Sequence, residues 1–143
     1  MPVAIPHFDA QNQVQGLPPI CLGKDLKLEI RPATVADVHG MSALINHYAS
    51  SNVMLARGPQ YLYQHIQDYM VVTAPARDKD HEVVVACGAL HVLWSDLAEI
   101  RSIAVHAGCQ GQNWGKKIVQ ALVERCRALQ IPRVFVFTLE MEF

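Results

Sequence analysis

The spacing of apolar residues along the chain predicts helices at residues 34–50, 58–70 and 114–129. The first opens on Thr34 with Asp37 three residues later, which is the pattern of a capping box. The second has Pro59 in its first turn, where proline is favoured. The residues expected on the inward faces are Val38, Met41, Leu44 and Ile45 in the first helix, Leu62, Ile66 and Tyr69 in the second, and Ile118, Leu122, Val123 and Cys126 in the third.

Alternating or continuous apolar runs rich in β-branched residues predict the strands. They lie at residues 26–32, 70–72, 81–94, 99–105 and 132–139. A tight turn at 95–98 joins two of them as a hairpin, and the helix at 114–129 connects 99–105 to 133–139 as a βαβ crossover. The element order β-α-α-β-β-β-α-β predicts an α/β (α+β) domain at residues 26–143, with a mixed, mostly antiparallel sheet and flanking helices. Residues 1–25 are proline-rich and predict an irregular N-terminal arm outside the core.

Composition narrows the class of protein. The chain has 143 residues, of which 51% are hydrophobic and 17% charged, as in a folded domain. The formal net charge of -1 argues against binding nucleic acid through bulk charge. We find no apolar run long enough for a membrane span and no secretory signal. The cysteines, Cys21, Cys87, Cys109 and Cys126, lack metal-ligand spacing and are expected to be reduced, in a cytoplasmic protein. No H-x-x-x-H pair occurs on a helix, so we expect no metal.

The segment "VHAGCQGQNWGKK" (residues 105–117) links a predicted strand to a predicted helix. Free amide groups at a helix N-terminus bind phosphate well, and Lys116 and Lys117 in the first turn suit that purpose although they oppose the helix dipole. An ordinary turn that uses glycines for positive φ explains the same residues. The strict dinucleotide and P-loop patterns both fail here, so spacing alone leaves the two interpretations open.

A resemblance favours the phosphate-binding interpretation. The segment "AEIRSIAVHAGCQGQNWGKKIVQALVERC" resembles the acetyl-coenzyme A motif of the GNAT superfamily of N-acetyltransferases, whose loop reads Q/R-x-x-G-x-G/A. Gln110 and Gly115 match it, while Asn113 replaces the middle glycine. Asn tolerates positive φ better than most residues, so the loop can keep its shape. The segments "VMLARGPQYLYQHIQDY" and "QIPRVFVFTLEMEF" resemble the short-form N-acetylglutamate synthases within that superfamily.

The resemblance implies direct acetyl transfer from acetyl-coenzyme A (acetyl-CoA) to the α-amine of L-glutamate, a small-molecule substrate, in arginine biosynthesis. The alternatives are transfer to another small amine or a protein, and a coenzyme-binding domain without activity. The implied coenzyme contacts are the backbone of Ile103, Ala104 and Val105 for the pantetheine, and Gln110, Gly111, Gln112, Asn113, Trp114, Gly115 and Lys116 for the pyrophosphate.

The resemblance also nominates residues for the acceptor side. Glu99 matches the position of a general base; it shares strand parity with Arg101, Ile103 and Val105, so we expect all of them on one face of the sheet. A surface carboxylate paired with Arg101 is the alternative. Arg57 matches a position that binds a substrate carboxylate, which the guanidinium fork suits, and Arg101 is a second candidate. A solvent-facing Arg57 is the alternative. Tyr61, Tyr63 and Tyr69 are expected to be packing residues, and Cys87 and Cys109 are not expected to be nucleophiles.

Proteins of this family continue beyond the position that matches Phe143. We therefore expect the GNAT fold without its last strands, and an uncovered edge beside residues 133–139. Such an edge favours pairing with another chain, for example in a homodimer.

Overall fold

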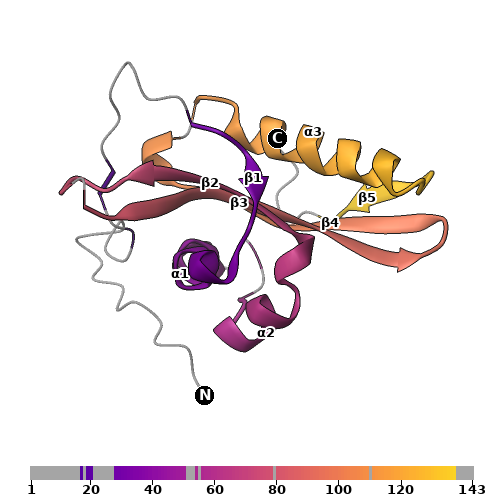
Figure 1. Ribbon diagram of the computed structural model, residues 1–143, viewed down its shortest axis with the longest axis horizontal. Helices are drawn as coiled ribbons and strands as arrows, with labels where there is room; N and C mark the ends of the chain where they lie inside the picture. The colour runs from indigo at the N-terminus through magenta and orange to yellow at the C-terminus, as the bar shows by residue number, and fades with distance from the viewer. Residues whose placement is uncertain are drawn as a thin grey trace.

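The computed structural model describes residues 17, 19–20, 28–50, 54, 56–78, 80–109 and 111–137. Its centre is a five-stranded sheet in the order β1-β2-β3-β4-β5 (Figure 1). All neighbouring strands are antiparallel except β4 and β5, which are parallel. The strands are β1 (Arg31–Pro32), β2 (Tyr69–Pro75), β3 (Glu82–Trp94), β4 (Leu97–Val105) and β5 (Val134–Val136). This is the mixed, mostly antiparallel sheet that the element order predicts.

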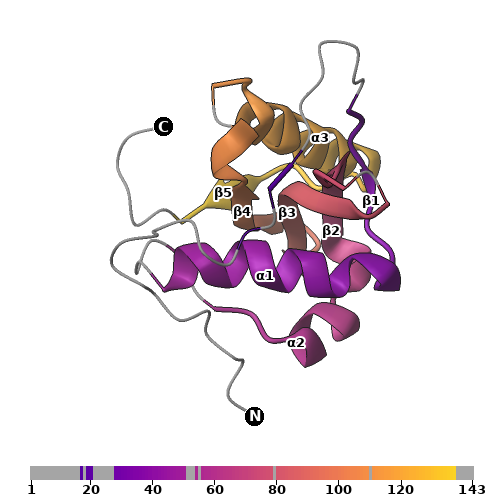
Figure 2. The same ribbon diagram turned by 90° about the vertical axis from the view of Figure 1, so that its left-hand side faces the viewer.

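The helices cover both faces of the sheet. Helices α1 (Val38–Ala49) and α2 (Pro59–Gln64) lie on one face, and α3 (Trp114–Ala128) lies on the other (Figures 1 and 2). The core is accordingly divided in two. One cluster contains Met41, Leu44 and Ile45 of α1, and the other contains Ile118 and Leu122 of α3. All five side chains are fully buried, so the stripes predicted for these helices are confirmed.

Close packing of the helices depends on glycine at two positions. A Cβ on Gly88 of β3 would lie 2.6 Å from Ile118 Cγ2, and one on Gly40 of α1 would lie 2.7 Å from Val84 Cγ2. Real Cβ contacts are longer than this, so each glycine lets a helix approach the sheet more closely than a side chain would allow. Both helices are thereby held directly against β3.

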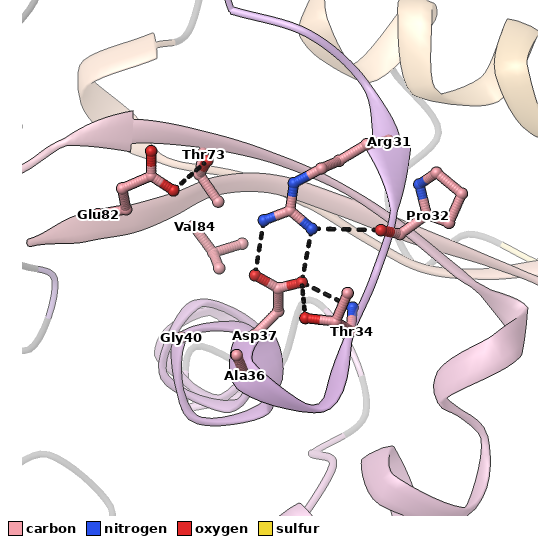
Figure 3. A pocket seen from close by; sticks show the side chains of 9 residues that line it. All are labelled: Arg31, Pro32, Thr34, Ala36, Asp37, Gly40, Thr73, Glu82 and Val84. Carbon is pink, nitrogen blue, oxygen red and sulfur yellow. Dashed lines mark hydrogen bonds and ion pairs between the residues drawn. The ribbon is translucent and has the colours of Figure 1, made fainter.

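The start of α1 is anchored to β1 by an ion pair (Figure 3). A short 3₁₀ turn, Val35–Asp37, precedes the helix, and the Asp37 carboxylate accepts a hydrogen bond from the Thr34 amide at 2.7 Å, as the capping box predicts. Arg31 donates to both oxygens of the same carboxylate, at 2.8 and 2.9 Å. Burial raises the pKa of Asp37, but the hydrogen bonds and charge of Arg31 and the hydrogen bonds from Thr34 outweigh it, and the pKa lies below its ordinary value.

This ion pair borders a hollow of about 490 Å³ beside β1 and the start of α1. Figure 3 shows that the Arg31 guanidinium points at Asp37, while Glu82 accepts a hydrogen bond from Thr73 across the hollow at 3.0 Å. Each charged group of the hollow therefore already has a partner, and the pair formed by Arg31 and Asp37 anchors the start of α1 to β1.

Several predicted boundaries were wrong. The helix predicted at 58–70 ends at Gln64 and continues as a 3₁₀ turn, Ile66–Asp68. Tyr69, expected on its inner face, instead begins β2, because burial in the sheet outweighs the helical spacing. The short strand expected at 70–72 therefore runs over Tyr69–Pro75, and Ala76, the next residue, forms an isolated bridge with Ile20.

The other differences concern strand ends. β4 begins at Leu97, so the hairpin turn contains Ser95 and Asp96 alone. β1 and β5 are shorter than predicted, although residues 26–27 and 138–139 lie outside the described residues. Within the predicted arm, Leu17 is buried in the core and Ile20 pairs with Ala76, so these two residues are not outside the core.

Among the helices of the described segments, none is long and apolar enough to cross a lipid bilayer. Cys87, Cys109 and Cys126 are buried and carry free thiols, whereas Cys21 lies outside the described residues.

Candidate active site

A β-bulge in β4 decides which face each candidate residue occupies. Cys87 pairs with Ala104 and Ala89 pairs with Arg101, so Gly88 opposes two residues of β4. One of these, Ser102, has a φ of 57°, in the left-handed region. The extra residue inverts the alternation of side chains along the rest of the strand. The prediction that Glu99, Arg101, Ile103 and Val105 share one face is therefore wrong.

The contacts on each side of the bulge show this inversion. Arg101, before the bulge, donates a hydrogen bond to Tyr61 of α2. Ile103, after the bulge, packs into the core cluster that contains α3, and the Val105 side chain lies 3.8 Å from the Cβ position of Gly115 in α3. Glu99 and Arg101 thus face the α2 side of the sheet, and Ile103 and Val105 face the α3 side.

The outer edge of β4 is only partly paired. β5 pairs with Ala98, Glu99 and Ile100, and within the described residues no strand pairs with this edge of β4 beyond Ile100. The Tyr48 hydroxyl, at the end of α1, donates a hydrogen bond to the Val105 carbonyl. Backbone groups of β4 from Arg101 to Val105 can therefore pair with an extended ligand that enters between β4 and β5.

The loop after β4 turns sharply into α3. Gly111 has a φ of 87°, and Asn113, the N-cap residue of α3, has a φ of 62°. The expectation that Asn113 can adopt the left-handed conformation is confirmed, since its short polar side chain tolerates that region. Earlier in the loop, His106 Nδ1 accepts a hydrogen bond from the Gly108 amide at 2.9 Å, which fixes the departure from β4.

Side chains of the loop hold the N-terminus of α3 in place. Trp114 is buried, and its indole N–H donates to Gln112 Oε1 at 3.1 Å. The Lys117 ammonium lies 4.3 Å from the centre of the Trp114 ring, as a cation–π pair. Gly111, Asn113 and Lys116 are exposed, whereas Gln110 lies outside the described residues. The loop therefore offers exposed amides and Lys116 at a helix N-terminus, where an anion is stabilised.

A second group of polar side chains lines the α2 side of the sheet. Arg101 Nε lies 2.7 Å from Glu99 Oε1, and Arg101 Nη1 donates to the Tyr61 hydroxyl at 3.0 Å. The exposed fractions of the Arg101 and Glu99 side chains are 24% and 14%. The ion pair considered for Glu99 is therefore present, but the carboxylate is largely buried rather than on the open surface.

Arg57 belongs to the same group. Its guanidinium carbon lies 4.5 Å from the centre of the Tyr61 ring, and its Nε is buried with no hydrogen-bond partner in the described part of the chain. Such an atom is costly unless a ligand or water satisfies it. The alternative interpretation, in which the Arg57 side chain faces solvent, does not hold because its Nε atom is buried. The structure thus brings Arg57, Arg101 and Glu99 together around one tyrosine.

Asn46 of α1 holds Arg57 in place, and the sequence reasoning missed it. Its side-chain amide donates to the Arg57 carbonyl and accepts from the Arg57 amide, both at 3.0 Å. The only signal in the sequence was a polar residue on the inward side of α1 beside Ile45, since a buried amide in that position must find hydrogen-bond partners. Asn46 therefore acts as a positioning residue.

The other tyrosines and cysteines take different positions. Tyr69 is buried as expected, and burial raises the pKa of its hydroxyl, which lies 3.2 Å from Ser102 Oγ. Tyr63 is 44% exposed, and its ring lies edge-on to the His39 ring with centroids 6.5 Å apart. Burial raises the pKa of Cys87 to about 12 and also raises that of Cys109. Thiols in such surroundings stay protonated, in keeping with their exclusion as nucleophiles.

Comparisons with known proteins identify related sequences over most of the chain. The profile of the Acetyltransferase (GNAT) family matches residues 41–141. A Mycobacterium tuberculosis protein named amino-acid acetyltransferase is 40% identical over 120 residues, which cover 84% of this chain and 67% of that protein. A protein of the same name from Mannheimia succiniciproducens is 30% identical over 82% of this chain and 26% of its own length.

Comparison with solved structures also identifies similar proteins. A Mycobacterium tuberculosis protein in complex with CoA and NLQ is 41% identical, with a TM-score of 0.69, over 78% of this chain and 65% of that one. N-acetylglutamate synthase from Neisseria gonorrhoeae, complexed with coenzyme A and N-acetyl-glutamate, is 25% identical, with a TM-score of 0.70, over 81% of this chain and 26% of that one.

The chain spans two thirds of the Mycobacterium tuberculosis relative, at 67%, and about a quarter of the longer relatives, at 26%. The matched segment of the family profile nevertheless includes α1 from Met41 onward, α2, α3 and every strand after β1. The mixed sheet with its crossover is also the architecture of these structural neighbours. The chain belongs to the acetyltransferase (GNAT) family.

Proposed function

We propose that this chain is an acetyl-CoA-dependent N-acetyltransferase that acetylates the α-amine of an amino acid, with L-glutamate as the first candidate. One observation carries the proposal: within the described residues no strand pairs with β4 beyond Ile100, and the loop that follows β4 brings the chain to the N-terminus of α3, where Gly111, Asn113 and Lys116 are exposed. A long, extended ligand with a phosphate at one end matches that arrangement. Family membership and the coenzyme A present in two structural neighbours support the same ligand.

In this proposal the pantetheine arm pairs with the backbone of Ile103, Ala104 and Val105. The pyrophosphate binds the loop amides, and the loop residues that the motif nominates, Gln110 to Lys116, surround it. The thioester carbonyl lies near the bulge, where an amide of β4 stabilises the developing negative charge. Because Glu99 and Arg101 precede the bulge and face α2, the acceptor amine approaches from the α2 side.

The reaction forms one bond and breaks one. The amine nitrogen attacks the thioester carbonyl carbon, the carbon–sulfur bond breaks, and its electron pair leaves on the coenzyme A sulfur. The acceptor ammonium first gives one proton to a base, which we assign to Glu99, and the nitrogen gives up a second proton after the attack. The thiolate takes up a proton from the site or from water, so one proton is released overall. The Tyr48 hydroxyl, at the Val105 carbonyl, is a candidate proton donor to the thiolate.

Arg57 is assigned to the acceptor carboxylate. Its buried, unpartnered Nε and the planar guanidinium fit a bidentate carboxylate, and the ring of Tyr61 supports the guanidinium from one side. Arg101 is the second candidate, although Glu99 and Tyr61 already engage it. The relatives named amino-acid acetyltransferase and the N-acetyl-glutamate in one neighbour support an amino-acid substrate. A role in arginine biosynthesis, in the cytoplasm, follows if glutamate is the acceptor.

The test measures release of the coenzyme A thiol from acetyl-CoA with a panel of amino acids, simple amines and peptides. We expect turnover with α-amino acids and the highest kcat/KM with glutamate. Turnover restricted to amines without a carboxylate, or to peptides, would replace this proposal with a different N-acetyltransferase. Binding of acetyl-CoA in a calorimetric titration with no turnover would identify a coenzyme-binding domain without activity.

A further inference from the structure

Two histidines and an aspartate meet beside the acceptor side of the sheet. His65 follows α2, Asp68 lies in the 3₁₀ turn before β2, and His91 lies in β3. Asp68 Oδ2 is 3.5 Å from His65 Nδ1 and 3.4 Å from His91 Nδ1. One ligand atom from each residue can be chosen so that all lie within 4.8 Å of one another. The side chains are between 27% and 32% exposed, so the group is accessible but not free in solvent.

These distances suit metal ligands better than hydrogen bonds. Nitrogen-to-oxygen hydrogen bonds in proteins are commonly about 2.7–3.2 Å long, and both contacts of Asp68 exceed that range. Ligand atoms about 2.0–2.1 Å from a tetrahedral zinc ion are about 3.3–3.4 Å apart. Two edges of the ligand triangle therefore already have close to the required length. The third, between the two imidazoles, is at most 4.8 Å and has to shorten when an ion binds.

Neighbouring contacts restrict the positions of the three side chains. The His65 ring stacks on Tyr61 with centroids 4.3 Å apart, and the His91 ring approaches the His65 ring edge-on at 5.7 Å. A backbone hydrogen bond from the Asp68 amide to the His65 carbonyl, 2.9 Å long, fixes their spacing. These contacts of the fold hold the side chains near one another, so little ordering is needed when an ion binds.

The local charge also allows a cation. Three arginines lie on the surrounding elements, and each is engaged elsewhere. Arg101 pairs with Glu99 at 2.7 Å, Arg57 lies over the Tyr61 ring, and Arg125 donates to the Gln67 carbonyl at 2.8 Å. Among the described residues, the side-chain partners of Asp68 are two imidazoles, which carry a charge only when protonated. The negative charge of its carboxylate is therefore available to a cation. Two imidazoles with one carboxylate suit Zn²⁺, Co²⁺ or Ni²⁺ rather than Mg²⁺ or Ca²⁺, which prefer oxygen ligands.

We propose that His65, Asp68 and His91 form a binding site for a divalent transition-metal ion of the Zn²⁺ type. The protein supplies three ligands, and the partial exposure of the side chains leaves further coordination positions for water or a small ligand. The expectation of no metal considered histidines spaced along one helix, whereas these ligands come from different elements. Metal binding does not depend on acetyl transfer, so the result of the metal titration does not decide the result of the acetyltransferase assay, or the reverse.

The experiment uses the untagged, metal-stripped chain. Titration with Co²⁺ is followed by visible absorption, and Zn²⁺ is then added as a competitor. We expect a saturable cobalt spectrum at about one equivalent, abolished by Zn²⁺. His91→Asn and Asp68→Asn should each weaken binding by more than about tenfold, since even second-sphere changes cost about 10–100-fold.

His81→Asn is the matched control. His81 also contacts an aspartate, with Nδ1 3.1 Å from Asp78 Oδ2, but the described residues supply no third ligand there. This variant should bind Co²⁺ like the wild type. Circular dichroism of the metal-free variants checks that each one folds, and a metal-dependent rise in melting temperature should occur in the wild type and in His81→Asn alone.

Two results would overturn the proposal. One is the absence of saturable Co²⁺ or Zn²⁺ binding by the folded wild-type chain. The other is equal binding by the wild type and by folded His91→Asn and Asp68→Asn, which would assign the ion to another location.

Discussion

The coenzyme side and the acceptor side of the candidate active site are built differently. The coenzyme side consists mainly of backbone, namely the open edge of β4 and the amides at the N-terminus of α3. The acceptor side consists of side chains from the α1–α2 connection, α2 and β4, with Arg57, Tyr61, Glu99 and Arg101 in contact. A binding site made of backbone groups requires mainly suitable φ values, whereas a binding site made of side chains requires several elements to pack together.

The bulge at Ser102 joins these two regions. Residues before it project toward α2 and residues after it project toward α3, so one strand contributes to both sides. A continuous β4 would place Glu99 and Val105 on the same face. Substitutions on the two sides should therefore have separable effects, on the acceptor kinetics in one case and on coenzyme binding in the other.

The largest effect is expected from Glu99→Gln on the acceptor side. If Glu99 takes the ammonium proton, kcat should fall by about 10²–10⁴-fold, because that is the usual contribution of a positioned base. The measurement is the initial rate of coenzyme A release over a range of pH, with acetyl-CoA binding determined separately by calorimetry. Glu124→Gln, exposed on α3, is the control. A normal rate across the pH range would remove Glu99 from the role of base.

Arg57→Ala should have the next largest effect. Loss of a bidentate carboxylate contact should lower kcat/KM for glutamate by about 100-fold, equivalent to about 2.7 kcal/mol. The KM for acetyl-CoA should change little, because Arg57 lies on the acceptor side. Steady-state kinetics with each substrate varied in turn measures both, with Arg127→Ala on the exposed face of α3 as control. Equal losses for both substrates would contradict the separation of the two sides.

Asn46→Ala tests whether the acceptor side depends on support from α1. The substitution leaves the Arg57 amide and carbonyl without their side-chain partner, which should lower the free energy of unfolding by about 2–4 kcal/mol. The KM for glutamate should also rise, by about tenfold, as Arg57 loses its position. Urea unfolding and steady-state kinetics measure the two effects. Gln64→Ala, at an exposed position of α2, is the control. An unchanged KM would limit Asn46 to stability.

Asn113→Gly should have a small effect, on the coenzyme side. Asn113 already has a φ of 62°, which glycine adopts without strain, and the change removes a side chain where the backbone approaches the pyrophosphate. We expect acetyl-CoA affinity within about twofold of the wild type, or tighter. Calorimetry measures it, with Gly111→Ala as the opposite case, because its φ of 87° strains any side chain. A marked loss in Asn113→Gly would make the Asn113 side chain a ligand.

Asp37→Asn lies outside both regions and should leave the kinetics unchanged. The pKa of Asp37 is lowered in the folded chain, so the ion pair with Arg31 contributes stability above the ordinary pKa of an aspartate and loses it as pH falls through the lowered value. The wild type should exceed the variant by about 2 kcal/mol in free energy of unfolding at pH 7. The difference should shrink below about pH 4, where the carboxyl takes up its proton. Urea unfolding at several pH values measures this; a difference that does not change with pH would contradict it.

Much of the fold followed from local pattern. The amphipathic stripes of α1 and α3, the β3–β4 hairpin and the crossover through α3 depend on residues close in sequence, so periodicity indicates them. The segment at 58–70 did not follow its pattern, because Tyr69 is stabilised by burial in β2 and by Ser102, which is distant in sequence. The prediction of a shared face for Glu99 and Val105 failed since no local pattern marks the bulge.

The sequence by itself determined the backbone of the loop after β4, since a glycine at 111, an asparagine at 113 and the start of a helix already predict the positive φ values and the free amides that can bind an anion. Only the tertiary structure decided the acceptor side. The bulge turned Glu99 and Arg101 toward α2, Asn46 fixed the backbone of Arg57, and the sheet brought His91 to Asp68. The physical reason is range: backbone conformation is set by neighbours along the chain, whereas contacts between side chains depend on how distant elements pack.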